Sequence, residues 1–299
     1  MNKFLQIAAA ATAVALPLYV ADMRRAYKRL EQYETDSFKT ASGTMAYVDE
    51  GFGETILISH GIFGGYDQGM VSLKGIVGDD YRKIALSRFG YPGSELPPMP
   101  TPQHQASVFA ELLDHLNIEK AFILATSAGG AAALSFGLRY PERAKGLILV
   151  SSGVPSAKIA AEQAKSAGPP HALLYEFPIW LSTKFLGPIL GLTFGSKVDK
   201  EFLQTMLPIK PRRKGIETDA ELTNLDMDVH YEKYPIEEID VPILVIHAKD
   251  DPMAKFGSIE KFLTRTHAET VIFDTGGHLL SGHQTEGTAA IKKFITKHS

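Results

Sequence analysis

The fold of this 299-residue chain follows from one stretch, Phe122-Ile123-Leu124-Ala125-Thr126-Ser127-Ala128-Gly129-Gly130. Its apolar first half is typical of a buried β-strand, and the alanine-rich segment that follows favours a helix. A strand that turns directly into a helix at a serine strains the backbone of that serine, and the residues two positions away must be small. Ala125 and Gly129 meet that condition. We therefore predict that the turn raises the Ser127 hydroxyl above a sheet, with helix N–H groups aimed at it.

The turn pattern alone does not establish a function. Position 125 holds alanine where glycine is usual, and a short small-Ser-small run also arises by chance. An ordinary strand–turn–helix with an incidental serine is the alternative, so the interpretation depends on the partners of Ser127.

Strand and helix patterns alternate along most of the chain. Short apolar runs predict strands at 35–40, 44–50, 55–59, 82–86, 122–126, 146–150, 241–247 and 269–274. Helical spacing predicts helices at 102–116, 128–140 and 287–297. Residues 154–234 contain no β-type runs. The simplest architecture is one mostly parallel sheet with helices on both faces, interrupted by a mainly helical lid.

Two later strands end in polar residues that suit a serine nucleophile. A serine hydroxyl needs a base to accept its proton and an acid to orient that base. The run 245–252 is a buried strand that ends at Asp250-Asp251, and the run 271–278 ends in a Gly-Gly loop before His278. Acid and base thus follow Ser127, each after a strand.

In this order of residues, the chain resembles the α/β-hydrolase superfamily from about residue 35 to the C-terminus, apart from the lid. The resemblance implies an α/β-hydrolase fold with Ser127 as nucleophile, Asp251 as acid and His278 as base. Asp250 remains the alternative acid. The resemblance also implies a core of residues 35–153 and 236–299, a lid of residues 154–235, and a preceding segment 1–34.

Two loops add to the resemblance. The run 59–65, Ser-His-Gly-Ile-Phe-Gly-Gly, is similar to the family's His-Gly-x-x-Gly oxyanion segment. The resemblance assigns the two backbone donors to Ile62 and Ala128, with His60 as a structural brace. The run 87–94 resembles another family loop, with the arginine displaced by one place, and we interpret it as a structural turn.

The N-terminus predicts a membrane anchor. Residues 4–20 are almost wholly apolar, and Arg24, Arg25, Lys28 and Arg29 follow them. The segment falls between a signal-peptide core and a full span in length, and bulky residues spoil a cleavage site. We expect an uncleaved anchor with a basic linker, and the positive cluster favours the cytoplasmic face. A cleaved signal with a periplasmic or secreted domain is the alternative.

Composition excludes several classes of site. With no cysteine, disulfides, zinc-thiolate sites and a thiol nucleophile are impossible. A net charge of −3 without a basic stripe gives no reason to expect nucleic acid. No metal motif or phosphate-binding loop is present, so we expect no cofactor, and we infer no obligatory protein partner.

The serine favours acyl chemistry, since family members with an aspartate nucleophile act on epoxides and haloalkanes. Apolar residues crowd 173–194 of the lid. We expect a carboxylesterase or lipase-like enzyme for lipophilic esters such as monoacylglycerols. One alternative is a carbon–carbon bond hydrolase of ring-cleavage diketones, with Arg212, Arg213 or Lys214 to hold a carboxylate, although we expect these three residues to form a solvated basic loop. Another is a catalytically dead binding protein of the same fold.

Overall fold

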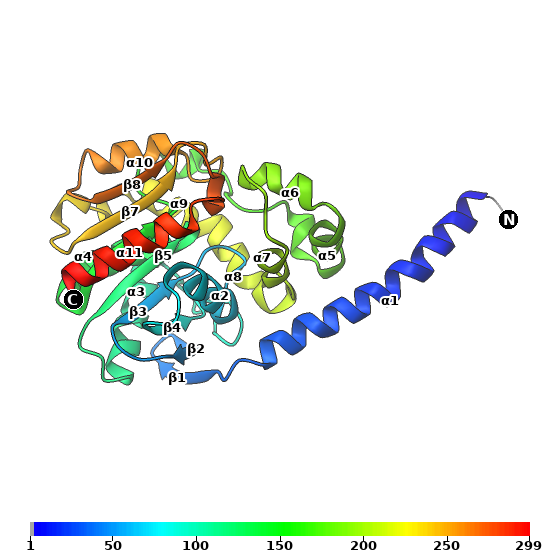
Figure 1. Ribbon diagram of the computed structural model, residues 1–299, viewed down its shortest axis with the longest axis horizontal. Coiled ribbons are helices and arrows are strands. Elements are labelled where there is room, and N and C mark those ends of the chain that lie inside the picture. Colours follow the sequence, from blue (N-terminus) through cyan, green and yellow to red (C-terminus); the bar gives the residue numbers. More distant parts are fainter. Residues whose placement is uncertain (1–2) are drawn as a thin grey trace.

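The structure, a computed structural model, describes residues 3–299, with side chains from residue 15 onward. A central sheet carries helices on both faces, and a group of helices forms a cap beside it (Figure 1). The strands are β1 Asp36–Thr40, β2 Gly43–Glu50, β3 Thr55–Ser59, β4 Arg82–Leu86, β5 Ala121–Thr126, β6 Ala144–Val150, β7 Ile243–Ala248 and β8 Glu269–Phe273. The helices are α1 Lys3–Glu31, α2 Tyr66–Val77, α3 Pro102–His115, α4 Gly130–Arg139, α5 Glu176–Phe185, α6 Gly187–Phe194, α7 Lys200–Thr205, α8 Arg213–Thr218, α9 Asn224–Val229, α10 Phe256–Leu263 and α11 Gln284–His298.

The strand order in the sheet is β1-β2-β4-β3-β5-β6-β7-β8. β1 pairs with β2 and β2 with β4 in antiparallel fashion, and all later pairs are parallel. The predicted strands all form, with ends shifted by a few residues. Two helices were not predicted, α2 and α10. Both contain glycine, which weakens the helical signal in a sequence.

Alternate residues of the parallel strands supply two separate cores, one on each face of the sheet. On one face Leu57 and Ile123 pack with α3, α4 and α10. On the other, Ile58 and Phe122 pack with α2 and α11. A strand buried on both faces needs a continuous apolar run, which explains why β3 is buried along its whole length.

The cap comprises α5 to α9, and the described residues between β6 and β7 form no strand. Two buried ion pairs fasten it to the sheet domain. Arg88 donates to both carboxylate oxygens of Asp219, at 2.7 and 2.6 Å, and Arg212 donates to both of Asp67, at 3.0 and 2.6 Å. Asp219 opens a π-helical turn, Asp219–Thr223, that aims its carboxylate inward. Tyr91 donates a further hydrogen bond to it at 2.5 Å.

α1 is a single helix that contains the residues expected to form a basic linker. Its apolar start points away from the rest of the protein, whereas its end packs against the cap (Figure 1). Met23 and Ala26 are buried in a cluster with cap residues, and Tyr19 lies edge-on to Trp180 with ring centroids 5.3 Å apart. The stretch after Val20 is therefore a docked helix and not a free linker.

For most of the expected anchor the structure describes the helical backbone alone, since no side chain before residue 15 is described. In the part of the chain that the structure describes, no single helix is both long and apolar enough to cross a membrane. The pair α5 and α6 meets the same criteria of length and composition, with a bend of 91° between the two helices.

The Arg88–Asp219 pair predicts a large effect on stability. Asp219→Ala leaves a buried guanidinium without its carboxylate, and we expect it to lower the free energy of unfolding by about 3–5 kcal/mol. The measurement is urea unfolding. The double variant Arg88→Met/Asp219→Leu, which removes both charges, should recover most of the loss.

The control for this prediction is the ion pair between Arg143 and the exposed Asp114, whose atoms lie 2.6 Å apart. Asp114→Ala should cost less than about 1 kcal/mol. Equal losses for Asp219→Ala and Asp114→Ala would show that the cap does not depend on the buried pair.

Candidate active site

Ser127 occupies a strained turn between β5 and α4. Its φ is 50°, a left-handed conformation that costs a residue with a side chain about 1–3 kcal/mol. A short 3₁₀ turn, Ser127–Gly129, joins the strand to the helix. A Cβ on Gly129 would overlap the Ser59 carbonyl, and one on Gly130 would overlap the Gly153 carbonyl. Only glycine fits at these two positions, and the sequence predicts a small residue at position 129.

The structure brings Ser127, His278 and Asp251 into one hydrogen-bonded row. The Ser127 Oγ lies 3.0 Å from His278 Nε2, and His278 Nδ1 lies 2.8 Å from Asp251 Oδ2. His278 stands on the turn after β8, and Asp251 follows β7. With Nδ1 donating to the carboxylate, Nε2 presents its lone pair to the hydroxyl. This geometry suits proton transfer from serine to histidine.

The environment of Asp251 keeps its carboxyl group ionised. Burial acts to raise its pKa, but the hydrogen bond and charge of His278 and the N–H groups of Ala254 and Met253 bring the pKa below its ordinary value. Those two N–H groups donate to Oδ1 at 3.0 and 2.8 Å, which leaves Oδ2 free for His278. The negative charge that an imidazolium would need is thus present at neutral pH and is lost only when the pH falls through that lowered pKa.

Asp250, the alternative acid, takes another role. Its side chain accepts hydrogen bonds from the N–H groups of Gly276 and Gly277, at 3.2 and 2.8 Å. It holds the loop that presents His278 and does not contact the imidazole. The structure therefore places Asp251, and not Asp250, beside the histidine.

The loop after β3 passes directly over Ser127. A Cβ on Gly61 would lie 3.1 Å from the Ser127 Cβ, a tight contact, so glycine eases the close approach of the loop backbone. Ile62 follows in the same loop and lines the cavity at Ser127, and Ala128 is the residue after the serine. Their N–H groups remain the predicted oxyanion donors.

His60 is a buried brace for this loop. Its Nδ1 donates to the Gly61 carbonyl at 2.8 Å, and its Nε2 accepts from the Arg88 N–H at 3.0 Å. Burial and the charge of Arg88 lower its pKa well below the ordinary value, so the ring stays neutral. The run 87–94 is a turn in which Gly90 and Gly93 have positive φ, in keeping with a structural role.

Sequence reasoning overlooked His247, which lies beneath the acid loop. The side chain is fully buried, its Nε2 donates to the Ala254 carbonyl at 2.7 Å, and it lies 3.7 Å from Asp251 Oδ2. Burial lowers its pKa. The only signal in the sequence is a polar residue inside an otherwise apolar strand, which does not reveal what the side chain touches.

A cavity of about 580 Å³ extends from Ser127 and His278 to the space between α2 and α11. This volume suits a small organic ligand. Its wall is chiefly apolar, formed among others by Ile62, Phe63, Val71, Ile76, Phe202, Met206, Leu279 and Ile291.

The expectation that Arg212, Arg213 and Lys214 form a solvated basic loop is wrong for Arg212, which is fully buried against Asp67. Arg213 donates to the Leu174 carbonyl and lies 4.5 Å from the ring centre of Tyr175. None of the three lines the cavity at Ser127.

Comparison with known proteins agrees with this geometry. The profile described as "Alpha/beta hydrolase family" matches residues 56–291. The chain belongs to this family. The family carries its members' nucleophiles at the strand-to-helix turn occupied here by Ser127.

Curated relatives of this α/β hydrolase match only over part of their length. A homoserine O-acetyltransferase from Thermus thermophilus is 46% identical over 66 residues, which are 22% of this chain and 17% of the relative. A 2-hydroxy-6-oxo-6-phenylhexa-2,4-dienoate hydrolase from Comamonas testosteroni is 32% identical over 112 residues, 36% of this chain and 39% of the relative. The chain therefore spans well under half the length of either relative.

Solved structures show the same fold over much longer stretches. An esterase from Exiguobacterium antarcticum has a TM-score of 0.68 at 18% identity, and the match covers 87% of this chain and 98% of the esterase. A bacterial membrane phospholipase A has a TM-score of 0.67 at 17% identity, with 99% of both chains covered.

The two aspartates of the site can be told apart by matched substitutions. Asp251→Asn removes the charge that orients and stabilises His278, and we expect kcat to fall by about 10⁴. Asp250→Asn keeps an oxygen for the loop N–H groups, and we expect a loss below about tenfold. Steady-state kinetics with a p-nitrophenyl ester measures both, and the reverse ranking would contradict the placement of the acid.

Proposed function

We propose that this α/β hydrolase cleaves lipophilic carboxylic esters through an acyl-enzyme on Ser127. The observation that carries the proposal is the hydrogen-bonded row of Ser127, His278 and Asp251 at one end of an apolar cavity. A serine with this partner set attacks carbonyl carbon, and an apolar cavity binds an acyl chain.

In the proposed reaction His278 Nε2 takes the proton of Ser127 as Oγ bonds to the ester carbonyl carbon. The carbonyl oxygen becomes an oxyanion that accepts hydrogen bonds from the N–H groups of Ile62 and Ala128. The intermediate collapses, the C–O bond to the alcohol breaks, and His278 returns the proton to the leaving oxygen. Water, deprotonated by His278, then attacks the acyl-enzyme, and the acid departs as Ser127 regains its proton.

The position of the cavity supports a substrate with a long apolar acyl group. It continues from Ser127 between α2 and α11, where Gly287 is buried, yet apart from its own helix backbone no atom lies within 4 Å of the place of a Cβ. This space has room for several methylene groups. The names of two structural neighbours, an esterase and a membrane phospholipase A, point to the same chemistry.

A carbon–carbon bond hydrolase for ring-cleavage diketones is the second candidate, because one matched relative has that activity in its name. Such substrates carry a carboxylate that needs a cation. In the described part of the chain the cavity at Ser127 has one cationic side chain in its wall, the exposed Lys197, and Arg212 is occupied by Asp67. A lipophilic ester therefore fits this wall better than a diketone that carries a carboxylate.

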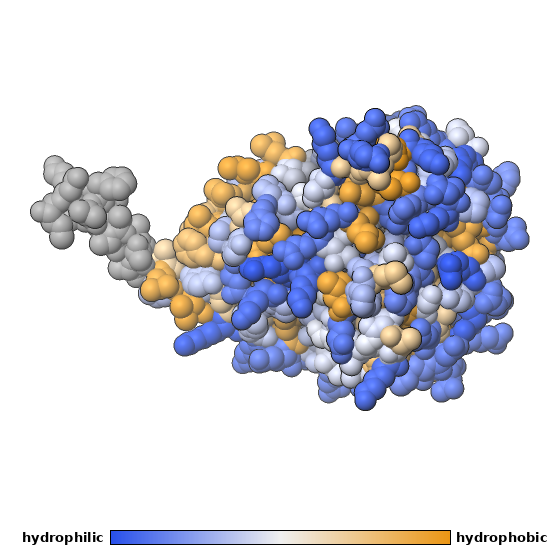
Figure 2. Space-filling model, turned by 180° about the vertical axis from the view of Figure 1, so that it is seen from behind, coloured by the Kyte–Doolittle hydropathy of each residue, from blue (hydrophilic) through white to orange (hydrophobic). Residues whose placement is uncertain are grey.

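We further propose that the protein is membrane-associated through α1. Leu16, Leu18 and Val20 expose large apolar side chains on this helix, and exposed apolar residues of α5 and α6 lie nearby. Figure 2 shows this apolar surface gathered at the end of the molecule from which α1 emerges. The basic residues after the apolar stretch favour the cytoplasmic face, which a reporter fused to the C-terminus would test.

An activity-based probe tests the nucleophile and the alternative of a dead binding protein. A fluorophosphonate should label Ser127 covalently in the native protein, seen as a mass increase on the peptide that contains it. Ser127→Ala should abolish labelling and lower kcat by about 10⁴ or more, and it should not lower the melting temperature. An unlabelled native protein would contradict the proposal.

A substitution that fills part of the cavity tests the proposed binding site for the acyl chain. Gly287→Leu fills the space between α2 and α11, and excluding about two methylene groups at ~0.8 kcal/mol each should lower kcat/KM for decanoate and longer esters by about tenfold. Acetate ester turnover should be unaffected, since the acetyl group does not reach that far.

The matched control is Gly257→Leu on α10. Gly257 also has open space around it and does not line the cavity. Its chain-length profile should equal that of the native protein. A uniform loss across all esters for Gly287→Leu would argue against an acyl site between α2 and α11.

A further inference from the structure

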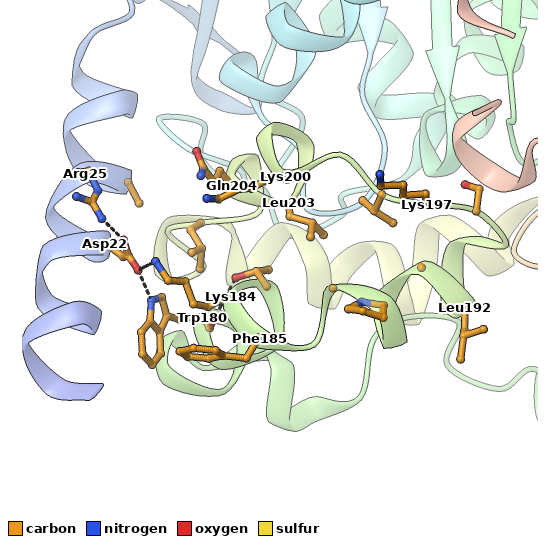
Figure 3. A pocket seen from close by; sticks show the side chains of 18 of the residues that line it. Asp22, Arg25, Trp180, Lys184, Phe185, Leu192, Lys197, Lys200, Leu203 and Gln204 are labelled. Carbon is orange, nitrogen blue, oxygen red and sulfur yellow. Dashed lines mark hydrogen bonds and ion pairs between the residues drawn. The ribbon is translucent and has the colours of Figure 1, made fainter. Parts of the chain in front are cut away.

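A second cavity, of about 1150 Å³, lies between α1 and the cap helices α5, α6 and α7 (Figure 3). It shares only Lys197 and Val198 with the wall of the cavity at Ser127, and no member of the Ser127–His278–Asp251 row lines it. The proposed ester hydrolysis makes no use of this space.

The wall of this cavity carries an excess of positive charge. Its one acidic side chain is Asp22, and its basic side chains are Arg25, Arg29, Lys184, Lys197 and Lys200. Asp22 accepts hydrogen bonds from Lys184 at 2.8 Å and from Trp180 Nε1 at 2.9 Å, and it also contacts Arg25 (Figure 3). Burial acts to raise the pKa of Asp22, but these bonds lower it to about 2. Asp22 is therefore charged and offsets only one of the cations.

Arg29 is the most deeply buried of these cations, and it donates to the Leu207 carbonyl but has no carboxylate of its own. Its side chain is three-quarters buried, and the carboxylate of Asp67 is 4.0 Å away and already accepts two hydrogen bonds from Arg212. Among the described residues, the buried Arg29 Nε has no hydrogen-bond partner, and neither has the Oγ of Ser196 in the same wall. A buried guanidinium without a full counter-charge is costly, which favours an anionic ligand beside it.

The mouth of the cavity is apolar. Phe185 is 54% exposed and Leu192 is 79% exposed, and both line the cavity. They belong to the exposed apolar surface of α5 and α6, which adjoins α1 (Figures 1 and 2). A ligand that matches this site therefore needs an anionic group for the interior and an apolar part for the mouth.

We propose that this cavity binds the headgroup of an anionic glycerophospholipid. Its phosphate would lie between Arg29, Lys184 and Lys200, because a phosphate has several acceptor oxygens for several donors. Its acyl chains would lie along Phe185 and Leu192. The site would join α1 to the cap through a bound lipid, and its wall at Lys197 and Val198 is also a wall of the cavity at Ser127.

The sole tryptophan of the chain allows ligand binding to this cavity to be followed by fluorescence. Trp180 lines this cavity, is 1% exposed, and does not line the cavity at Ser127. The full chain carrying Ser127→Ala, which cannot turn the lipid over, is titrated with monomeric dihexanoyl phosphatidylglycerol while the tryptophan emission is recorded. We expect a saturable change, a weaker response to dihexanoyl phosphatidylcholine, and none to inorganic phosphate.

Two variants with a control assign the response to the cavity. Arg29→Gln should weaken binding of phosphatidylglycerol about tenfold, the value of one charge-assisted hydrogen bond. Lys200→Glu, an exposed position that keeps the test valid if Arg29→Gln fails to fold, should weaken it about fivefold. The control is Lys261→Glu on α10, which changes the net charge by the same amount as Lys200→Glu. Lys261 lies in neither cavity wall, so this variant should bind the lipid as the parent protein does.

Several results would overturn the proposal. An equal response to phosphatidylcholine would remove the charge requirement, and an equal response to inorganic phosphate would make this a site for a free anion. A missing response, or a response insensitive to both charge variants, would show that no anionic lipid binds here. Because binding is measured on Ser127→Ala, these results are independent of whether the native protein hydrolyses esters.

Discussion

The close approach of three backbone segments at Ser127 is the constraint on which the rest of the site depends. The end of β5, the loop after β3 and the start of α4 meet so tightly that Gly129 and Gly130 have no room for a side chain and a Cβ on Gly61 would crowd Ser127. Ser127 itself adopts a strained, left-handed backbone conformation in this turn. This crowding raises the hydroxyl toward His278 and brings the loop backbone, with its predicted oxyanion donor, to the same point.

Buried charge holds the surroundings of that point in place. Arg88 donates to the His60 carbonyl as well as to Asp219, and Arg212 donates to the Gly64 carbonyl as well as to Asp67. Each arginine therefore ties the loop over Ser127 to a partner carboxylate, and both pairs cross between the sheet domain and the cap. Buried pairs of this kind add little net stability, but they fix geometry, because any other arrangement would leave a charge unpaired.

The cap thus stands between two different environments. On one side it closes the apolar cavity at Ser127, and on the other it packs against α1 through Trp180 and Asp22. The exposed apolar residues of α5 and α6 lie on the α1 side. Under the proposed membrane association, the cap would meet lipid on one side and form part of the wall of the site on the other.

The sequence by itself determined the order of the strands along the chain, the turn at Ser127 and the region of the acid and base. These features depend on local patterns: apolar runs, small residues beside the serine and polar residues after strands. It left Asp250 and Asp251 unresolved, placed Arg212 on a solvated loop and did not reveal the role of His247. Only the tertiary structure decided these, because burial and side-chain pairing depend on neighbours in space. The partner of Arg212, Asp67, lies 145 residues away, and even the nearby contacts of His247 and Asp251 leave no local pattern in the sequence.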